Sequence, residues 1–149
     1  MHTTFTLNPE MSMIEMTLEM AEKAVKAAQA KAKELGTPIT VTVVDEAGRL
    51  VLCARGDGTG FLTPETSRGK AMASVAFRRP TKEMVDLARE HPAFWNAMPG
   101  LAPGQILPST GGVPFKSAGR VIGAIGCGGG TGEEDHQCAL AGVAALGGG

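Results

Sequence analysis

Residues 39–55 read ITVTVVDEAGRLVLCAR, and this stretch decides the fold. Residues 39–44 are rich in β-branched side chains, residues 45–48 form a short polar segment that ends on glycine, and apolar residues return at 50–53. Two such runs on either side of a short glycine-containing loop predict a β-hairpin. We therefore expect the sheet of this protein to contain antiparallel neighbours.

Helical patterns lie on both sides of the hairpin. Apolar residues recur at helical spacing between Thr17 and Gly36, where the threonine can cap the start of a helix and the glycine its end. Thr63-Pro64 and Thr81 predict two more helices, because hydroxyl residues and proline favour the first turn. A buried strand is expected at 120–127, and the capping-box sequence after it predicts a last helix.

The resulting order is helix, hairpin, two helices, two strands and a helix. No strand–helix–strand repeat demands a parallel sheet, so we predict an α+β fold, with one antiparallel β-sheet flanked by helices in a single domain. A chain of 149 residues is the length of one domain. We expect residues 1–16 to form an N-terminal arm and residues 17–149 to form the domain.

The composition excludes several classes of partner. The chain has 14 Lys+Arg against 15 Asp+Glu, so it lacks the basic excess that nucleic-acid binding requires. No apolar run is long enough to span a membrane, and no secretory signal is recognisable at the start, which together predict a cytoplasmic protein. The three cysteines match no zinc or CxxC spacing and are expected to be free thiols.

Glycine and proline crowd into the region from 99 to 132. A stretch as long and irregular as 99–119 is typical of a binding loop, and we expect it to roof a cavity. The glycine-rich segment 126–132 joins a strand to a helix without a P-loop or dinucleotide-binding pattern. Two interpretations stay open for it: a tightly packed start of a helix, or a backbone-lined site for a neutral or carboxylate group.

A few side chains are candidates for chemistry on a small acid. Arg55 can hold a carboxylate through two hydrogen bonds, or it can pair with Asp57 to fix the glycine loop. Lys70 lies within a helix of small residues and can pair with a substrate acid or form an imine. Cys127 is either a small buried apolar residue or a thiol that takes part in proton transfer.

Metal-ligand spacing is absent among the histidines and cysteines, so we predict no metal site. Covalent haem attachment needs a CxxCH motif, which the sequence lacks. Non-covalent haem needs only one axial ligand, which His91, His136, a methionine or a cysteine could supply. The scarcity of aromatic residues, five Phe and one Trp, makes a pocket of stacked rings hard to build.

Several motifs, in the same order over about residues 17–146, together resemble the GlcG/HbpS-like family, which includes the C-terminal domain of PduO-type proteins. They are VVDEAGRLV at 43–51 with RGDG at 55–58, KA at 70–71, FRRPT at 77–81, GGVP at 111–114, GRVIGAIG at 119–126, ED at 134–135 and AG at 141–142. The resemblance implies an antiparallel sheet flanked by helices and a homo-oligomer. Members are described as haem- or corrinoid-associated, and one branch is thought to act on amino-muconate-type ring-cleavage products.

Our main interpretation is an enzyme without a cofactor that acts on a small unsaturated carboxylate, as an enamine/imine deaminase or tautomerase of a ring-cleavage pathway. Such chemistry needs one acid and one base beside the substrate. The candidate catalytic residues are Lys70, Cys127, Glu134 and Asp135, and the candidate substrate-binding residues are Arg55, Asp57, Gly112, Val113, Pro114 and Gly126. The alternative is a non-catalytic protein that binds or senses haem or another tetrapyrrole, and a purely structural subunit is a third possibility.

Overall fold

The computed structural model describes residues 14–101 and 106–147. One antiparallel sheet has the strand order β2–β1–β4–β3, formed by β1 (Thr40–Asp45), β2 (Leu50–Ala54), β3 (Gly112–Ser117) and β4 (Arg120–Gly128). The hairpin predicted at 39–55 is β1 and β2, and Asp45 closes its turn by accepting the N–H groups of Ala47 and Arg49. The predicted α+β fold with an antiparallel sheet is confirmed.

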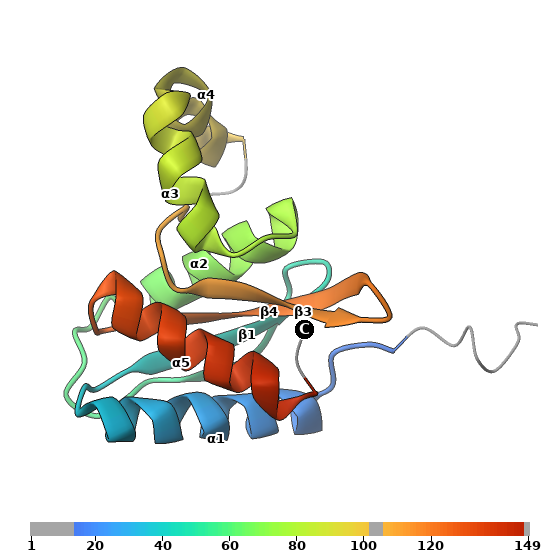
Figure 1. Cartoon of the computed structure of the whole chain (residues 1–149), viewed down its shortest axis with the longest axis vertical. Helices are drawn as coiled ribbons and strands as arrows, with labels where there is room; N and C mark the ends of the chain where they lie inside the picture. The colour runs from blue at the N-terminus through green and yellow to red at the C-terminus, as the bar shows by residue number, and fades with distance from the viewer. Residues whose placement is uncertain (1–13, 102–105, 148–149) are drawn as a thin grey trace, which may run out of the picture.

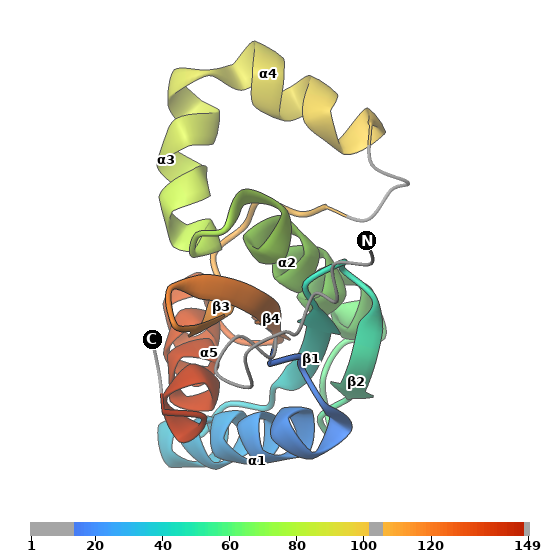
Figure 2. The same cartoon turned by 90° about the vertical axis from the view of Figure 1, so that its right-hand side faces the viewer.

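Helices cover both faces of this sheet (Figure 1). The long helices α1 (Leu18–Leu35) and α5 (Gly132–Ala145) pack side by side on one face, and α2 (Thr63–Phe77) lies on the other. The segment formed by α3 (Thr81–Glu90), α4 (Pro92–Ala97) and the 3-10 turn η2 (Met98–Gly100) projects from this body (Figure 2). We call this projecting segment the helical arm.

The two sides of the sheet carry different cores. The larger core, under α1 and α5, contains Val41, Val43, Phe115 and Ile125. The smaller core, under α2, contains Val44, Ala71, Val75 and Ala124. Small side chains on α2 and on the sheet face beneath it let the helix approach the sheet closely. At Gly126 even a Cβ atom would overlap the carbonyl oxygen of Ser67.

The local signals at helix ends are confirmed in part. Thr17 accepts the N–H of Met20 at 3.1 Å, and Gly36 ends α1 in the left-handed conformation. The predicted capping box at the start of α5 is present. The hydroxyl caps expected at Thr63 and Thr81 are wrong. Thr63 donates to the carbonyl of Gly60, and the Thr81 hydroxyl accepts the N–H of Gly112 at 2.8 Å and so ties α3 to β3.

The helical arm was predicted only in its first helix. Its cluster of Met84, Trp95 and Met98 packs against Ala73 of α2, and the rings of Phe77 and Trp95 lie 5.0 Å apart. No helix within the described ranges is long and apolar enough to cross a membrane. The expected N-terminal arm falls largely outside the described residues, and the domain boundary at residue 17 stays a prediction.

Candidate functional site

Three of the predicted catalytic residues meet in the interior of the protein. Lys70 of α2 donates from Nζ to Asp135 Oδ2 of α5 at 2.8 Å and to the carbonyl oxygen of Cys127 in β4 at 2.9 Å. Lys70 is 7% exposed and Asp135 2%, and Cys127 is fully buried. The N–H of Gly130 donates to the other carboxylate oxygen of Asp135 at 3.0 Å. This ion pair therefore joins α2, β4 and α5 across the sheet.

Burial sets the protonation of these groups. It raises the pKa of the Cys127 thiol well above the usual 9.0, and the nearby Cys138 and Asp135 act in the same direction. Burial also raises the pKa of Asp135, although the hydrogen bonds from Lys70 and Gly130 oppose that shift. A thiol that stays protonated is a poor nucleophile, so the surroundings of Cys127 favour the interpretation of a small buried residue.

The other predicted site residues lie apart from this ion pair. Arg55 and Asp57 are exposed in the glycine loop, where Arg55 donates to the carbonyl of Thr59 and forms no ion pair with Asp57. Glu134 accepts the N–H of Thr131 in the capping box. The glycine-rich segment before α5 is thus occupied by side chains of its own helix. The catalytic and binding roles proposed for these residues stay predictions.

The segment 112–114, with Gly126 beside it, belongs to the sheet. Val113 points into the larger core, and Pro114 lies opposite Ala124. Gly112 and Gly126 pair with each other and lie directly under α2, where a Cβ on either glycine would overlap a carbonyl oxygen of that helix. The missing side chains therefore allow helix packing at these two positions.

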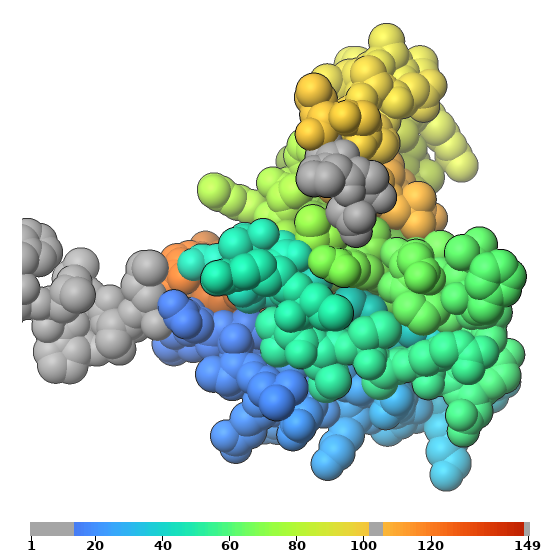
Figure 3. All heavy atoms as spheres, turned by 180° about the vertical axis from the view of Figure 1, so that it is seen from behind, coloured from blue at the N-terminus to red at the C-terminus, as the bar shows by residue number. Residues whose placement is uncertain are grey.

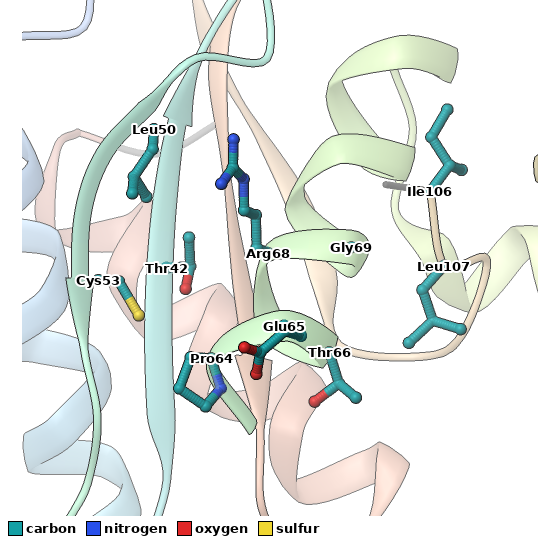
Figure 4. A pocket seen from close by; sticks show the side chains of 10 residues that line it. All are labelled: Thr42, Leu50, Cys53, Pro64, Glu65, Thr66, Arg68, Gly69, Ile106 and Leu107. Atoms are coloured by element: carbon teal, nitrogen blue, oxygen red, sulfur yellow. The ribbon is translucent and has the colours of Figure 1, made fainter. Parts of the chain in front are cut away.

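A cavity of about 530 Å³ lies along the first half of α2, where β1, β2 and the segment 106–107 also line it, and we call it the α2 groove. Figure 4 shows α2 in the middle, the strands β1 and β2 on one side and the segment 106–107 on the other. The N–H of Leu107 donates to the carbonyl of Gly69 at 3.0 Å, which holds that segment against the helix. The residues that line the α2 groove are Thr42, Leu50, Cys53, Pro64, Glu65, Thr66, Arg68, Gly69, Ile106 and Leu107.

Two lining residues give the α2 groove its chemical character. Arg68 has its Nε atom buried without a hydrogen-bond partner in the part of the chain that the structure describes. Arg68 also forms no ion pair within the described ranges, so its positive charge is available to an anionic group of a ligand in the groove. Cys53 is a free, half-buried thiol on β2, and β1 with Thr42 lies between that strand and Arg68 in Figure 4. The volume and the mainly apolar walls are those of a small-molecule site.

Sequence reasoning missed both residues. The sequence indicates Cys53 only as one of three cysteines that could be free thiols or haem ligands, and Arg68 belongs to no motif. The spacing of Glu65 and Arg68 places them on one face of α2, but only the packing of β2 and residues 106–107 against that face creates the cavity. The surface that contains β2 and the first turns of α2 is shown in Figure 3, with the helical arm above it.

His136 of α5 is buried, and its Nδ1 atom has no partner among the described residues. Burial lowers its pKa from 6.5, and the charge of Lys82 lowers it further, while Glu133 acts in the opposite direction. Within the described ranges, no group of three or more His, Cys, Asp or Glu side chains is placed to hold a metal ion. His136 does not line the α2 groove, so the effect of its buried ring is on stability.

We expect the melting temperature to fall as the pH decreases through 6.5. The unfolded chain takes up a proton at the ordinary histidine pKa of 6.5, whereas folded His136 does so only at lower pH. Between the two pKa values the unfolded state binds more protons, so acid favours unfolding. Thermal melts at pH 7.5, 6.5 and 5.5 test this. The melting temperature should depend less on pH in His136→Gln than in the exposed control His91→Gln. Equal slopes would contradict this assignment.

Comparison with known proteins gives consistent matches over most of the chain. A family model described as "Haem degrading protein HbpS-like" matches residues 16–144. The 15.0 kDa protein of the dhaT-dhaS intergenic region of Citrobacter freundii is 32% identical over 134 residues, which are 89% of this chain and 93% of that protein.

Solved structures share the fold. A double mutant of HbpS from Streptomyces reticuli has a TM-score of 0.81 and 31% identity, with 98% of this chain and 97% of that chain covered. The crystal structure of a complex of PduOC with haem has a TM-score of 0.80 and 25% identity, with 89% and 95% covered.

Proposed function

The chain belongs to the HbpS-like family, and from this premise we propose that it binds haem in the α2 groove. The relatives support haem as the ligand. One similar solved structure is a complex of PduOC with haem, and the description of the family model names a haem-degrading protein. The observation that carries the proposed site is a cavity of about 530 Å³ lined by the free thiol of Cys53 and by Arg68, which forms no ion pair in the described part of the chain.

The lining of the α2 groove fits this ligand. Leu50, Ile106 and Leu107 offer apolar surface to a porphyrin ring. The Arg68 guanidinium would hold a propionate, since arginine binds carboxylates through two parallel hydrogen bonds. Cys53 is the one lining residue of a type that commonly serves as an axial ligand. Bound haem would supply an iron centre, and this chain would supply its anchor, its axial contact and an apolar environment.

The interpretation as a deaminase or tautomerase receives no support from the relatives. The Lys70–Asp135 pair satisfies its own charges in the interior, so these residues offer little to a substrate. We therefore propose haem as the ligand in place of the expected absence of a cofactor. The homo-oligomer stays a prediction, favoured by exposed apolar side chains on the helical arm and directly after it, where Phe94 is 55% and Leu101 86% exposed.

Titration of the full chain with ferric haem tests this function. We expect a saturable Soret band that differs from that of free haem. Arg68→Met should weaken binding about 10-fold or more, because a hydrogen bond to a charged group contributes about 1.5–3 kcal/mol. Cys53→Ala should shift the Soret maximum, because Cys53 is the residue that would hold the haem iron.

The control variant is Arg89→Met, which removes an exposed arginine of the helical arm outside the groove. Its titration should match that of the wild type. A titration that shows only the spectrum of free haem would overturn the proposed function. Normal titrations with both Arg68→Met and Cys53→Ala would overturn the α2 groove as the haem site.

A further inference from the structure

A second cavity, of about 390 Å³, lies at the opposite end of α2, beside the β1–β2 and β3–β4 turns. Figure 1 shows both turns on the side of the molecule where α2 ends. We call it the turn pocket. Val75 and Val121 line it from the smaller core, and its charged lining residues are Glu46, Arg78, Lys116 and Arg120.

Positive charge dominates the turn pocket. Arg120 Nη2 lies 2.7 Å from Glu46 Oε2, so this arginine and the carboxylate neutralise each other. Arg78 and Lys116 form no ion pair with any residue in the described ranges. The C-terminus of α2 contributes about half a negative charge, which leaves the pocket with a net charge of about +1.5. The whole chain, in contrast, has a formal net charge of −1.

The backbone conformation of Arg78 indicates that its side chain has a role. It ends α2 with φ of +57°, a left-handed position where glycine or asparagine is the usual residue. A non-glycine residue there is strained, and such strain tends to persist at functional positions. In the described part of the chain, the Arg78 guanidinium forms no hydrogen bond. No internal contact of this side chain therefore explains why arginine occupies the left-handed position.

The β3–β4 turn places the other cations. Ala118 and Gly119 both have positive φ, so they form the tight two-residue turn that suits a β-hairpin. Ser117 pairs with Arg120, and Lys116 pairs with Val121, which packs under α2. Lys116 therefore lies on the same face of the hairpin as Val121, toward α2, whereas Arg120 lines the pocket beside Glu46 of the β1–β2 turn.

We propose that the turn pocket binds a compact anion with at least two negative charges, of the diphosphate or tricarboxylate class. The cavity volume lies within the range of small-ligand sites. Guanidinium groups bind phosphate and carboxylate oxygens through paired hydrogen bonds. Two uncompensated cations favour a ligand with two or more charges over a singly charged one. The site is separate from the α2 groove and does not depend on haem binding.

Titration of the full chain with inorganic pyrophosphate, followed by amide NMR, tests this proposal. We expect saturable shifts centred on Gly119, Arg120 and Val75. Citrate should produce shifts at the same amides, whereas acetate at equal ionic strength should not. Near 1 M salt the Debye length falls to about 3 Å, so pyrophosphate binding should be lost there.

Two variants should change the affinity in opposite directions. Arg78→Gly should weaken pyrophosphate binding about fivefold, as expected for one partly exposed charge pair, and should raise the melting temperature by relieving the left-handed strain. Glu46→Gln should strengthen binding by freeing Arg120. The adjacent Arg79→Ala is the matched control, because Arg79 does not line the pocket.

Three outcomes would overturn the proposal. They are shifts that never saturate, equal shifts with acetate, and unchanged binding in Arg78→Gly. The rise in melting temperature serves as an independent check that this variant is folded, so a loss of binding in it can be assigned to the missing guanidinium.

Discussion

Replacing Lys70 with methionine is expected to lower the free energy of unfolding by about 3–5 kcal/mol. The change leaves the Asp135 carboxylate, 2% exposed, without its cation, and removes the donor 2.9 Å from the Cys127 carbonyl. A lone buried charge is far less stable than a buried pair or an apolar replacement of both partners. Urea denaturation should show a lower midpoint at an unchanged m-value.

The pH dependence of Lys70→Met provides a second measurement. Burial already raises the pKa of Asp135 above 3.8 in the intact pair, and loss of Lys70 removes an interaction that opposes this shift. Above pH 3.8 the folded variant therefore binds the proton more tightly than the unfolded chain. By linkage, its stability deficit should shrink as the pH is lowered toward 4.

Two further variants distinguish the effect of an unpaired buried carboxylate from the effect of removing a lysine side chain. The double variant Lys70→Met with Asp135→Leu should recover much of the loss, because no unpaired charge remains. Lys82→Met removes an exposed partner of Glu133 and should change stability by less than about 1 kcal/mol. An equal effect of Lys70→Met and Lys82→Met would show that water reaches Asp135.

Local signals explain how much of the fold could be predicted. The β-hairpin at 39–55, the glycine end of α1 and the capping box of α5 each depend on a few neighbouring residues. Thr81 shows where such reasoning fails, because a distant N–H, that of Gly112, takes its hydroxyl. The short helix α4 gave no strong local pattern, and its place depends on Trp95 packing in the arm cluster.

The candidate site was harder to predict because it depends on contacts between distant residues. The sequence indicated Lys70 and Asp135 as residues that face a substrate, but 65 positions separate them and the fold turns them toward each other. Cys53 and Arg68 become lining residues only when β2 packs beside α2 and Leu107 bonds to the helix. No spacing along the chain contains that information.

Gly126→Ala is expected to destabilise the protein by about 3 kcal/mol, the upper end of what overpacking a core usually costs. The added methyl would overlap the Ser67 carbonyl and lie 2.7 Å from the Ala71 nitrogen, and both atoms belong to the backbone of α2. No side-chain rotation can relieve these contacts, so the helix must move away and open the smaller core at Ala71 and Val75. Urea denaturation and the melting temperature measure this loss.

Gly60→Ala is the matched control, because a Cβ there meets nothing within 4 Å and the backbone is not left-handed. It should stay within about 0.5 kcal/mol of the wild type. Any folded fraction of Gly126→Ala should also bind ferric haem more weakly, because a displaced α2 moves Arg68 relative to Cys53. Wild-type stability in Gly126→Ala would contradict the close helix–sheet contact on which the α2 groove is built.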